Sequence, residues 1–524
     1  MVIPRQAIGA LLSGLLTLSA FAPASAAGKR AHHRARVAPA ARAALKKRPV
    51  TGVAQAALSW LARPEIKHSR VGVEIMDLAS GEILFEHDGG KRHTPASTAK
   101  VLTTSCIYEL LGGDFVFNTS LLTNGQIKEG VLDGDLCLAT SQDPSFTRGD
   151  LIRLVQETRN NQAEKLRLIK GKLFVLAPAD GKDNFQVNWL VEDFGQDWMP
   201  VSSNFVIDRN NAYVSGFPKS FKVVDVRRSN LSILDTLMAS GIGSSFVSLD
   251  PTSNVLSLYH GVSIGANGKP DEKLRRDGPY VVANPEAYNT ALLVSTLSDQ
   301  SIEFAGKIVE AEHVTGIFAK QPRIILAEHK SKPLSAIIKW CLFDSDNLYA
   351  QQLLRTIAAT AEKPPRHPSS WQLNLEERGL NHMGEWLSSI GVPNKEVVLF
   401  DGCGLSRKNG VTPHALNLVL RHMSIKNPGY LDLLRAQDNG GKGRFRFKTG
   451  AMDTVRGITG ILTTYSGTNL VVTVLVNGHT PAVKDIRIVI ADLIERLKNT
   501  SIEPISKETA KPEATDTQAS KEPK

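Results

Sequence analysis

The sequence predicts an α/β (α+β) fold, in which an antiparallel sheet is flanked by helices and a large, mainly β region is inserted after the first long helix. Residues 71–86 alternate between apolar and polar positions as a β-hairpin does, and residues 443–448, 456–464 and 469–477 have the pattern of further strands. Helical periodicity follows each of these groups. About 250 residues lie between Ser97 and Ser345, which is too many for a loop. They have short strand-like segments and a helical pattern near residues 149–160.

The N-terminal end predicts export. Arg5 supplies a positive charge, residues 8–20 are apolar, and Ala24-Ser25-Ala26 has the form of a cleavage site. We therefore interpret residues 1–26 as a signal peptide, with no nearby cysteine to carry a lipid anchor. No later segment has the ~20 apolar residues of a membrane-spanning helix. The mature protein is expected to be soluble and exported, in the periplasm or another extracytoplasmic compartment.

Two further terminal segments have the composition of unstructured chain. Residues 27–50 are rich in lysine and arginine and contain no acid, which predicts a basic, flexible arm. The alternative for this arm is peripheral contact with an anionic wall or membrane surface. Residues 499–524 are mostly polar and predict a disordered tail. The arm supplies part of the formal net charge of +10, and we expect no nucleic acid as a partner.

The four cysteines are far apart in the sequence and have no C-x-x-C spacing; they are Cys106, Cys137, Cys341 and Cys403. This spacing indicates neither a metal site nor a redox motif, and no cofactor is expected. Cys106 and Cys341 lie among apolar residues at helical spacing and are interpreted as small core residues. Export would permit disulfides, but the spacing leaves their pairing open.

A helix is predicted after the hairpin. Pro95 suits its start, Val101, Leu102, Leu110 and Leu111 supply an apolar face, and Gly112-Gly113 ends it. Ser97 and Lys100 then occupy positions i and i+3 of the first turn, so that the amine can reach the hydroxyl. The unpaired N–H groups of the helix N-terminus would lie beside the hydroxyl.

Two more polar groups are expected to face the same site. Residues 333–342 and 348–360 have helical patterns, and Ser345-Asp346-Asn347 connects them. In the strand from Gly443 to Lys448 the two phenylalanines face one way and the cations face the other. If the phenylalanines enter the core, Lys448 faces the cleft.

Three motifs therefore follow in order: Ser97-Thr98-Ala99-Lys100, Ser345-Asp346-Asn347 and Lys448-Thr449-Gly450. Each is weak alone, but the ordered set is typical of penicillin-recognising serine acyltransferases. With the long insertion and with Asp143-Pro-Ser and Asp401-Gly-Cys-Gly404, the chain resembles a low-molecular-mass class C penicillin-binding protein, a D-alanyl-D-alanine carboxypeptidase/endopeptidase. This resemblance implies a penicillin-binding transpeptidase/β-lactamase-like domain, peptidoglycan stem peptides as substrates and β-lactam antibiotics as inhibitors.

The resemblance also implies a role for each residue of the motifs. Ser97 would form the acyl-enzyme, and Lys100 would accept its proton once burial and nearby Lys448 lower the pKa of its amine. Ser345 would relay a proton to the leaving group, and Asn347 would bind the peptide amide. Lys448 and Thr449 would hold the substrate carboxylate, and the backbone N–H groups of Ser97 and Ala451 would form the oxyanion hole.

Three features depart from the family pattern. Ala451 stands where a hydroxyl residue is usual after K-T-G, so the backbone donor is kept while one side-chain hydrogen bond to the carboxylate is lost. Turnover is expected to be weakened at most, and Arg446 is a candidate for replacing the hydroxyl. Cys403 stands where the family tends to have serine, and the segment between residues 430 and 447 is shorter than the family usually has.

Three other acidic or basic residues have both a functional and a structural interpretation. By resemblance Asp143 and Arg407 would line the pocket for the donor side chain, although a turn-forming aspartate and a solvated arginine are the alternatives. Glu377-Arg-Gly-Leu380-Asn381 matches the E-x-x-L-N motif of class A β-lactamases. It lies within a helical pattern, however, and we interpret Glu377 as a helix-surface residue.

The predicted organisation places the serine peptidase domain at residues 51–115 and 312–498 and the inserted region at residues 116–311. The first functional hypothesis is a serine-type D-Ala-D-Ala carboxypeptidase/endopeptidase. The alternatives are a serine β-lactamase and a catalytically weak wall-binding scaffold. The sequence leaves open the balance of carboxypeptidase and endopeptidase activity and the oligomeric state.

Overall fold

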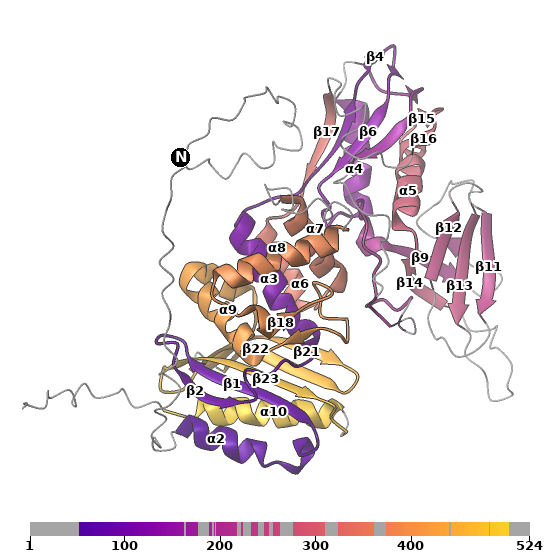
Figure 1. Ribbon diagram of the computed structural model, residues 1–524. Coiled ribbons are helices and arrows are strands. Elements are labelled where there is room, and N and C mark those ends of the chain that lie inside the picture. Colours follow the sequence, from indigo (N-terminus) through magenta and orange to yellow (C-terminus); the bar gives the residue numbers. More distant parts are fainter. Residues whose placement is uncertain are drawn as a thin grey trace, which may run out of the picture.

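The protein consists of a six-stranded sheet with helices on both faces and an inserted region that extends from one end (Figure 1). The predicted signal peptide, the basic arm and all but the first residues of the tail lie outside the described residues. The computed structural model describes residues 52–161, 164–176, 188–190, 193, 195–216, 222–223, 232–238, 246–250, 255–261, 276–309, 323–360, 374–439, 442–480 and 483–501.

The main sheet is antiparallel throughout, as the sequence predicted. Its central strands carry long apolar runs because helices cover both of their faces. The N-terminal hairpin joins the C-terminal strands through the pairing of β1 with β23, which closes the domain across the whole length of the chain. The strand order is β2 (Ile83–His87), β1 (Arg70–Asp77), β23 (Asn469–Asn477), β22 (Val455–Thr463), β21 (Lys442–Met452) and β20 (Arg435–Asn439).

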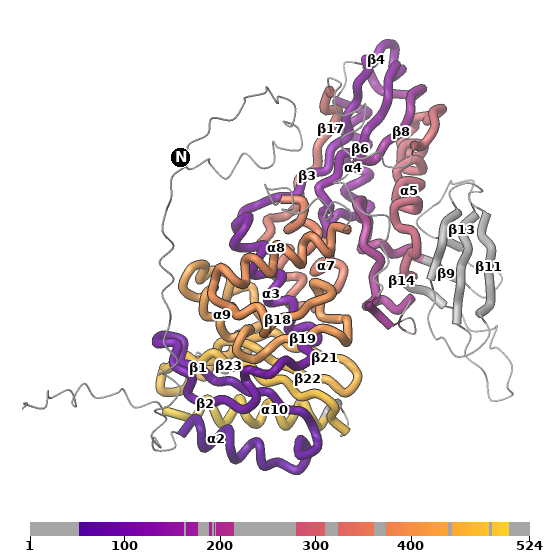
Figure 2. The backbone as a smooth tube through the Cα atoms, in the orientation of Figure 1, coloured from indigo at the N-terminus to yellow at the C-terminus, as the bar shows by residue number. Residues whose placement is uncertain are grey.

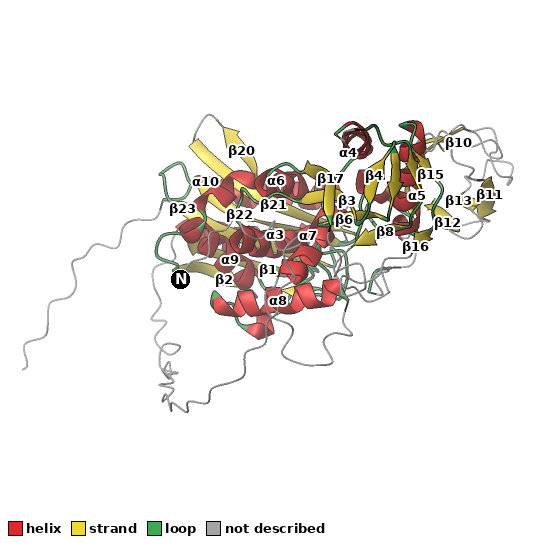
Figure 3. Ribbon diagram, turned by 90° about the horizontal axis from the view of Figure 1, so that it is seen from above, coloured by secondary structure: helices red, strands yellow, loops and turns green. Residues whose placement is uncertain are grey.

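Among the described elements, two helices cover one face of this sheet, and five lie on the other (Figures 1 and 3). The first layer, drawn in indigo and yellow in Figure 2, brings the two ends of the described chain side by side in α2 (Gly52–Leu61) and α10 (Val483–Lys498). The second layer contains α3 (Lys100–Leu111), α6 (Leu334–Phe343), α7 (Asn347–Thr360), α8 (Leu375–Ser389) and α9 (Pro413–Lys426). The 3₁₀ turn η3 (Pro64–Ile66) packs on α10 in the first layer. Short 3₁₀ turns and a two-stranded ladder complete the second layer: η4 (Ala96–Ala99), η9 (Asn394–Glu396), η10 (Pro428–Leu433), β18 (Val397–Val398) and β19 (Gly410–Val411).

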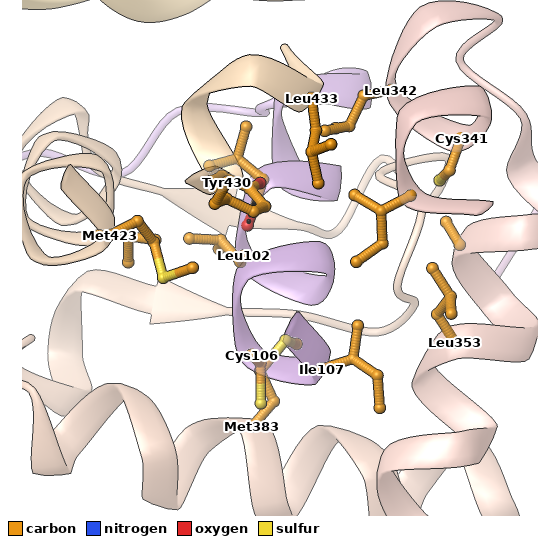
Figure 4. Close-up of a cluster of buried hydrophobic side chains, with 14 of the residues drawn as sticks. Leu102, Cys106, Ile107, Cys341, Leu342, Leu353, Met383, Met423, Tyr430 and Leu433 are labelled. Carbon is orange, nitrogen blue, oxygen red and sulfur yellow. Dashed lines mark hydrogen bonds between the residues drawn. The ribbon is translucent and has the colours of Figure 1, made fainter. Parts of the chain in front are cut away.

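Helix α3 lies at the centre of the second layer. Leu102, Cys106 and Ile107 are buried among side chains from the other helices of that layer, including Met383 and Tyr430 (Figure 4). One detail of the predicted face is wrong: Leu110 is 47% exposed. This packing holds the first turn of α3 in a fixed position.

The described residues of the inserted region form three sheets and two helices. Helix α4 (Arg148–Asn160) agrees with the predicted helix, and the capping box of Thr147 and Asp150 begins it. Helix α5 (Pro285–Asp299) was not foreseen. The strands are β3 (Asn118–Thr123), β4 (Gln126–Lys128), β5 (Val131–Asp133), β6 (Leu136–Thr140), β7 (Leu168–Ile169), β8 (Leu173–Leu176), β9 (Asn211–Gly216), β10 (Lys222–Val223), β11 (Ser232–Met238), β12 (Phe246–Asp250), β13 (Val255–Gly261), β14 (Arg276–Val282), β15 (Glu303–Phe304), β16 (Ile308–Val309) and β17 (Ile324–Lys330).

Strand β17 connects the inserted region to the peptidase helices. It pairs antiparallel with β3, so it belongs to the sheet β16-β8-β6-β3-β17. The sequence prediction had counted this segment with the peptidase domain, which was drawn from residue 312. We propose that the chain returns to the peptidase domain after Lys330, where β17 ends.

Candidate active site

The first turn of α3 carries the predicted nucleophile and its amine. Ser97 lies in the 3₁₀ turn η4, and Lys100 is the first residue of α3. The Nζ of Lys100 lies 3.0 Å from the Oγ of Ser97, which is hydrogen-bond distance. The spacing of three residues therefore brings the hydroxyl and the amine together as predicted.

The Nζ of Lys100 has two further acceptors, and the Lys100 side chain is fully buried. It donates to the Oδ1 of Asn347 at 2.6 Å and to the backbone carbonyl of Cys403 at 2.8 Å. A lysine has three donors, and all three have acceptors here. Sequence reasoning missed the carbonyl of Cys403, and because a main-chain atom is the acceptor, the exchange of serine for cysteine at this position leaves it in place.

Ser345 projects from the short connection between α6 and α7. Its φ angle is 58°, a left-handed conformation that is uncommon for a residue with a side chain. Its Oγ accepts a hydrogen bond from the Nζ of Lys448 at 3.0 Å, and the same Nζ donates to the carbonyl of Thr449 at 2.8 Å. The loop and the strand β21 thus meet at a hydroxyl–amine pair similar to the first.

Lys448 points away from the side of the sheet that holds the phenylalanines, as the alternation predicted. Phe445 and Phe447 stack on each other and pack with the core between the sheet and α10, while Lys448 is only 3% exposed. Burial, together with the positive charge of Lys100, lowers the pKa of Lys448 to about 7. Its ammonium therefore loses its proton close to neutral pH.

Two glycines let backbones approach one another around the nucleophile. A Cβ on Gly404, whose φ angle is +88°, would lie 1.9 Å from the carbonyl oxygen of Ala96. A Cβ on Gly450 would lie 2.6 Å from the carbonyl oxygen of Pro95. The turn that carries Ser97 is therefore held between β21 and the loop that carries Cys403, and larger residues at positions 404 and 450 would push it away.

The part of β21 that follows Lys448 forms an open edge. Strand β20 pairs with residues 442–447 only, so among the described strands residues 448–452 have a neighbour on one side alone. Thr449 and Ala451 are exposed there. An extended peptide could add to this edge by main-chain hydrogen bonds, next to the hydroxyl of Ser97.

Asn347 has a different set of contacts from the one expected. Its Oδ1 accepts from Lys100, and its Nδ2 donates to the carbonyl of Trp198 in the inserted region at 2.5 Å. Both ends of the amide are thus engaged within the protein. A substrate amide would have to share one of these contacts or replace it.

Asp143 and Arg407 have separate partners. Asp143 is buried, accepts hydrogen bonds from the N–H and hydroxyl of Ser145, and has its pKa raised by burial. Arg407 is 42% exposed and lies 4.0 Å from Asp453. The pKa of Tyr349, near the start of α7, is raised mainly by burial and then by the negative charges of Asp346 and Asp143. The carboxylate of Asp143 is therefore close enough to the start of α7 for its charge to act there.

Glu377 belongs to a capping box, which confirms the helix-surface interpretation. Its N–H donates to the Oδ1 of Asn374, and its carboxylate accepts from the N–H of Asn374. The side chain is exposed at the start of α8.

All four cysteines are buried and free. In the part of the chain that the structure describes, no cluster of three or more metal-binding side chains occurs and no helix is long and apolar enough to cross a membrane.

Comparisons with known proteins agree with this arrangement. A model of the D-Ala-D-Ala carboxypeptidase 3 (S13) family matches residues 53–497. The D-alanyl-D-alanine carboxypeptidase DacB of Haemophilus influenzae is 26% identical over 434 residues, which are 78% of this chain and 86% of that protein. A D-alanyl-D-alanine carboxypeptidase of an Actinomadura species is 26% identical over 358 residues, which are 67% of this chain and 63% of that protein.

Solved structures are similar in fold. Penicillin-binding protein 4 of Haemophilus influenzae has a TM-score of 0.68 at 23% identity, with 85% of this chain and 98% of that chain covered. Its complex with a β-lactam has a TM-score of 0.64, with 86% and 98% covered. The fold class predicted from the sequence is therefore confirmed. Because the family model spans the Ser97 turn, the Ser345 loop and the Lys448 strand, the chain belongs to the D-Ala-D-Ala carboxypeptidase 3 (S13) family.

Proposed function

We propose that this protein is a serine-type D-Ala-D-Ala carboxypeptidase and endopeptidase, which cleaves peptidoglycan stem peptides through an acyl-enzyme on Ser97. Family membership supports the reaction, and the names of the curated relatives support the substrate class. The observation that carries the assignment of residues is a pair of hydroxyl–amine contacts. Lys100 lies 3.0 Å from the Oγ of Ser97, and Lys448 lies 3.0 Å from the Oγ of Ser345.

The first half of the reaction uses both pairs. In its neutral form, Lys100 takes the proton of Ser97 while the Oγ attacks the carbonyl carbon of the penultimate D-alanine. The N–H groups of Ser97 and Ala451 would stabilise the oxyanion of the tetrahedral intermediate. As the peptide C–N bond breaks, Ser345 gives its proton to the leaving amine and is reprotonated from the ammonium of Lys448.

The second half hydrolyses the ester. Before it can act again, Lys100 must release the proton taken from Ser97, and Lys448 must regain the proton given to Ser345. Water then attacks the acyl carbon, neutral Lys100 accepts a proton of the water and gives it to the Oγ of Ser97 as the ester bond breaks. Lys448 and Thr449 would hold the terminal carboxylate of the substrate, Asn347 the peptide amide, and Asp143 and Arg407 the donor side chain. The carboxypeptidase reaction and the endopeptidase reaction differ only in the group attached to the leaving amine.

β-Lactams are proposed to acylate Ser97, since their strained amide would open at the same position. The β-lactam complex of penicillin-binding protein 4 from Haemophilus influenzae supports this. The adduct should persist, because Glu377 is occupied in a helix cap and is no base for a deacylating water. A serine β-lactamase would release the product, and a wall-binding scaffold would form no adduct. We also propose export by the N-terminal signal peptide.

The test combines product analysis with labelling. Purified stem peptides and cross-linked dimers are incubated with the protein, and released D-alanine and monomers are identified by mass spectrometry. A digest of penicillin-treated protein should carry the label on Ser97. Ser97→Ala should abolish both signals, whereas Ser389→Ala, at an exposed serine of α8, should leave both unchanged. Label on another residue, or full release within seconds, would refute the assignment.

A further inference from the structure

A groove with several arginines lies next to the open edge of β21. Its volume is about 380 Å³, and it lies between the β20–β21–β22 part of the sheet and α10. Thr449 and Ala451 form one end of its lining, and the side chains of Arg435, Arg456 and Arg487 also line it. Phe445 and Phe447 line it as well, so the groove lies on the α10 side of β21, and Thr449 lies at the strand edge between this groove and Lys448 on the other face. Its lining has three arginines and one carboxylate, that of Glu495, so its charge is positive overall.

Arg456 is the arginine that the sheet register brings to position 451. Strand β22 pairs with β21 so that Arg456 lies directly opposite Ala451. Directly opposed residues of an antiparallel pair project from the same face, with Cβ atoms about 4.5–5.5 Å apart. Because the side chain of Ala451 is only a methyl group, it leaves space beside the guanidinium of Arg456. A larger side chain at position 451 would fill this space.

The guanidinium of Arg456 is buried and incompletely bonded. Arg456 is 7% exposed, and its Nη1 donates to the carbonyls of Met452 and Val455, which hold it at the hairpin turn. Its Nε has no partner among the described residues. Burial and the nearby charge of Arg487 lower the pKa of Arg456. A cation in such surroundings is stabilised by an anion that binds beside it.

We propose that Arg456 binds the terminal carboxylate of the substrate beside Thr449, in place of the hydroxyl that position 451 lacks. This inference rests on the proposed function and adds a positioning residue to it. Arginine suits the task because its planar fork matches the two oxygens of a carboxylate. Unlike Lys448, it stays charged above neutral pH, so part of the anchoring would persist when the lysine loses its proton, and the contribution of Lys448 would be lost.

Two other arginines near the edge have partners elsewhere, and a third is exposed. Arg446, the candidate from the sequence, bonds to Asp432 and does not line the groove. Arg435 bonds to the carbonyl of Phe343 and lies over its ring. Arg487 is exposed on α10, so it serves as the matched control within the same groove.

The experiment compares two peptides that differ only in the terminal group. The first is diacetyl-lysyl-D-alanyl-D-alanine with a free carboxylate, and the second is its C-terminal carboxamide. Arg456→Ala should lower kcat/KM for the free acid by about tenfold to a hundredfold and change kcat/KM for the amide less than about twofold. Arg456→Lys should lose less than Arg456→Ala, and Arg487→Ala should lose less than about threefold for both peptides.

A second variant tests whether a hydroxyl at position 451 can replace the guanidinium of Arg456 as a hydrogen-bond donor to the carboxylate. Ala451→Thr should recover most of the loss caused by Arg456→Ala, while the same change in the otherwise unaltered protein should raise kcat/KM less than about threefold. Equal losses for acid and amide would mean that Arg456 only supports the hairpin turn, and would overturn the proposal. A loss from Arg487→Ala as large as that from Arg456→Ala would also overturn it. Failure of the unaltered protein to release D-alanine from either peptide would instead refute the proposed function.

Discussion

Two lysines at the site are buried and lie close enough for their charges to interact. Lys100 contacts the Ser97 hydroxyl, and Lys448 contacts the Ser345 hydroxyl. Two ammonium groups that are both removed from water repel each other strongly, so a proton on one disfavours a proton on the other. The positive charge of Lys100 thereby adds to burial in lowering the pKa of Lys448.

The pKa of Lys448 leads to a prediction of pH dependence. Because this pKa is about 7, the ammonium that would hold the substrate carboxylate is lost as the pH rises through 7. We expect kcat/KM for a free-acid peptide to fall above about pH 7, since kcat/KM reports the ionisation of the free enzyme. Initial rates at low peptide concentration between pH 5.5 and 9.5 would measure it.

Lys448→Arg provides the control, because arginine stays protonated throughout this range. The descending limb should disappear in that variant, whatever its overall rate. In the unaltered protein it should be shallower for the C-terminal carboxamide, which still needs the proton that Lys448 supplies to Ser345 but has no carboxylate to be held. If the rate for the free acid kept rising to pH 9 in the unaltered protein, Lys448 would act as a neutral base toward Ser345 rather than as a cationic anchor.

Among the secondary-structure elements, α8 shows how a catalytic motif can occur in a structural position. Its first residues resemble a β-lactamase motif, yet Glu377 and Asn374 form a reciprocal capping box. Such caps satisfy N–H groups that the helix itself leaves without partners. The same glutamate cannot both cap this helix and activate water at a distant serine.

Glu377→Ala should therefore affect stability and leave β-lactam chemistry unchanged. We expect the free energy of unfolding to fall by about 0.5–2 kcal/mol, as for other lost caps, and the half-life of the penicillin adduct to stay the same. Chemical denaturation and time-resolved mass spectrometry measure the two quantities. Glu385→Ala, at an exposed residue later in α8, is the control for both. A longer-lived adduct in Glu377→Ala would restore Glu377 as a candidate base.

At the scale of the whole molecule, the inserted region is attached to the catalytic helices by buried polar contacts. Trp189 donates its indole N–H to Asp401, whose carboxylate also accepts the N–H groups of Cys403 and Gly404. The loop that supplies the carbonyl to Lys100 is thus shared by both regions. Gln352 of α7 similarly donates to the carbonyl of Ser203.

The strongest of these contacts surrounds Arg355, which is fully buried in α7. Its Nη1 lies 2.9 Å from the carboxylate of Glu376, and its Nη2 donates to the Oδ1 of Asn204 in the inserted region. Arg355→Met should lower the free energy of unfolding by about 3–5 kcal/mol, because it leaves the buried carboxylate of Glu376 without its partner. Denaturant titration followed by fluorescence would measure the change.

A second substitution distinguishes loss of the pair from loss of packing. Arg355→Met with Glu376→Leu should recover much of the stability, since replacing both members removes the unpaired charge. Lys91→Met, which removes an exposed pair with Asp88, should cost less than about 1 kcal/mol. If the double variant were no more stable than Arg355→Met, the hydrogen bond to Asn204 would be the dominant contribution.

The sequence by itself determined those features that depend on neighbours along the chain. The contact of Ser97 with Lys100 follows from helical spacing, and the inward direction of Lys448 follows from strand alternation, because each local geometry has a fixed period. The hairpin, the antiparallel sheet, α4 and the surface position of Glu377 could be predicted for the same reason. The order of the three motifs, together with the long insertion between the first two, was sufficient to identify the family.

Only the tertiary structure decided which distant groups meet. The carbonyl of Cys403 at Lys100, the carbonyl of Trp198 at Asn347 and the position of Arg456 opposite Ala451 depend on packing and strand register. The pairing of β17 with β3 has the same origin. A periodic pattern predicts which face of an element is apolar, but not which other element covers that face. A main-chain acceptor cannot be predicted from residue type, because every residue has a backbone carbonyl. The partners of these residues could therefore be known only once the elements had packed.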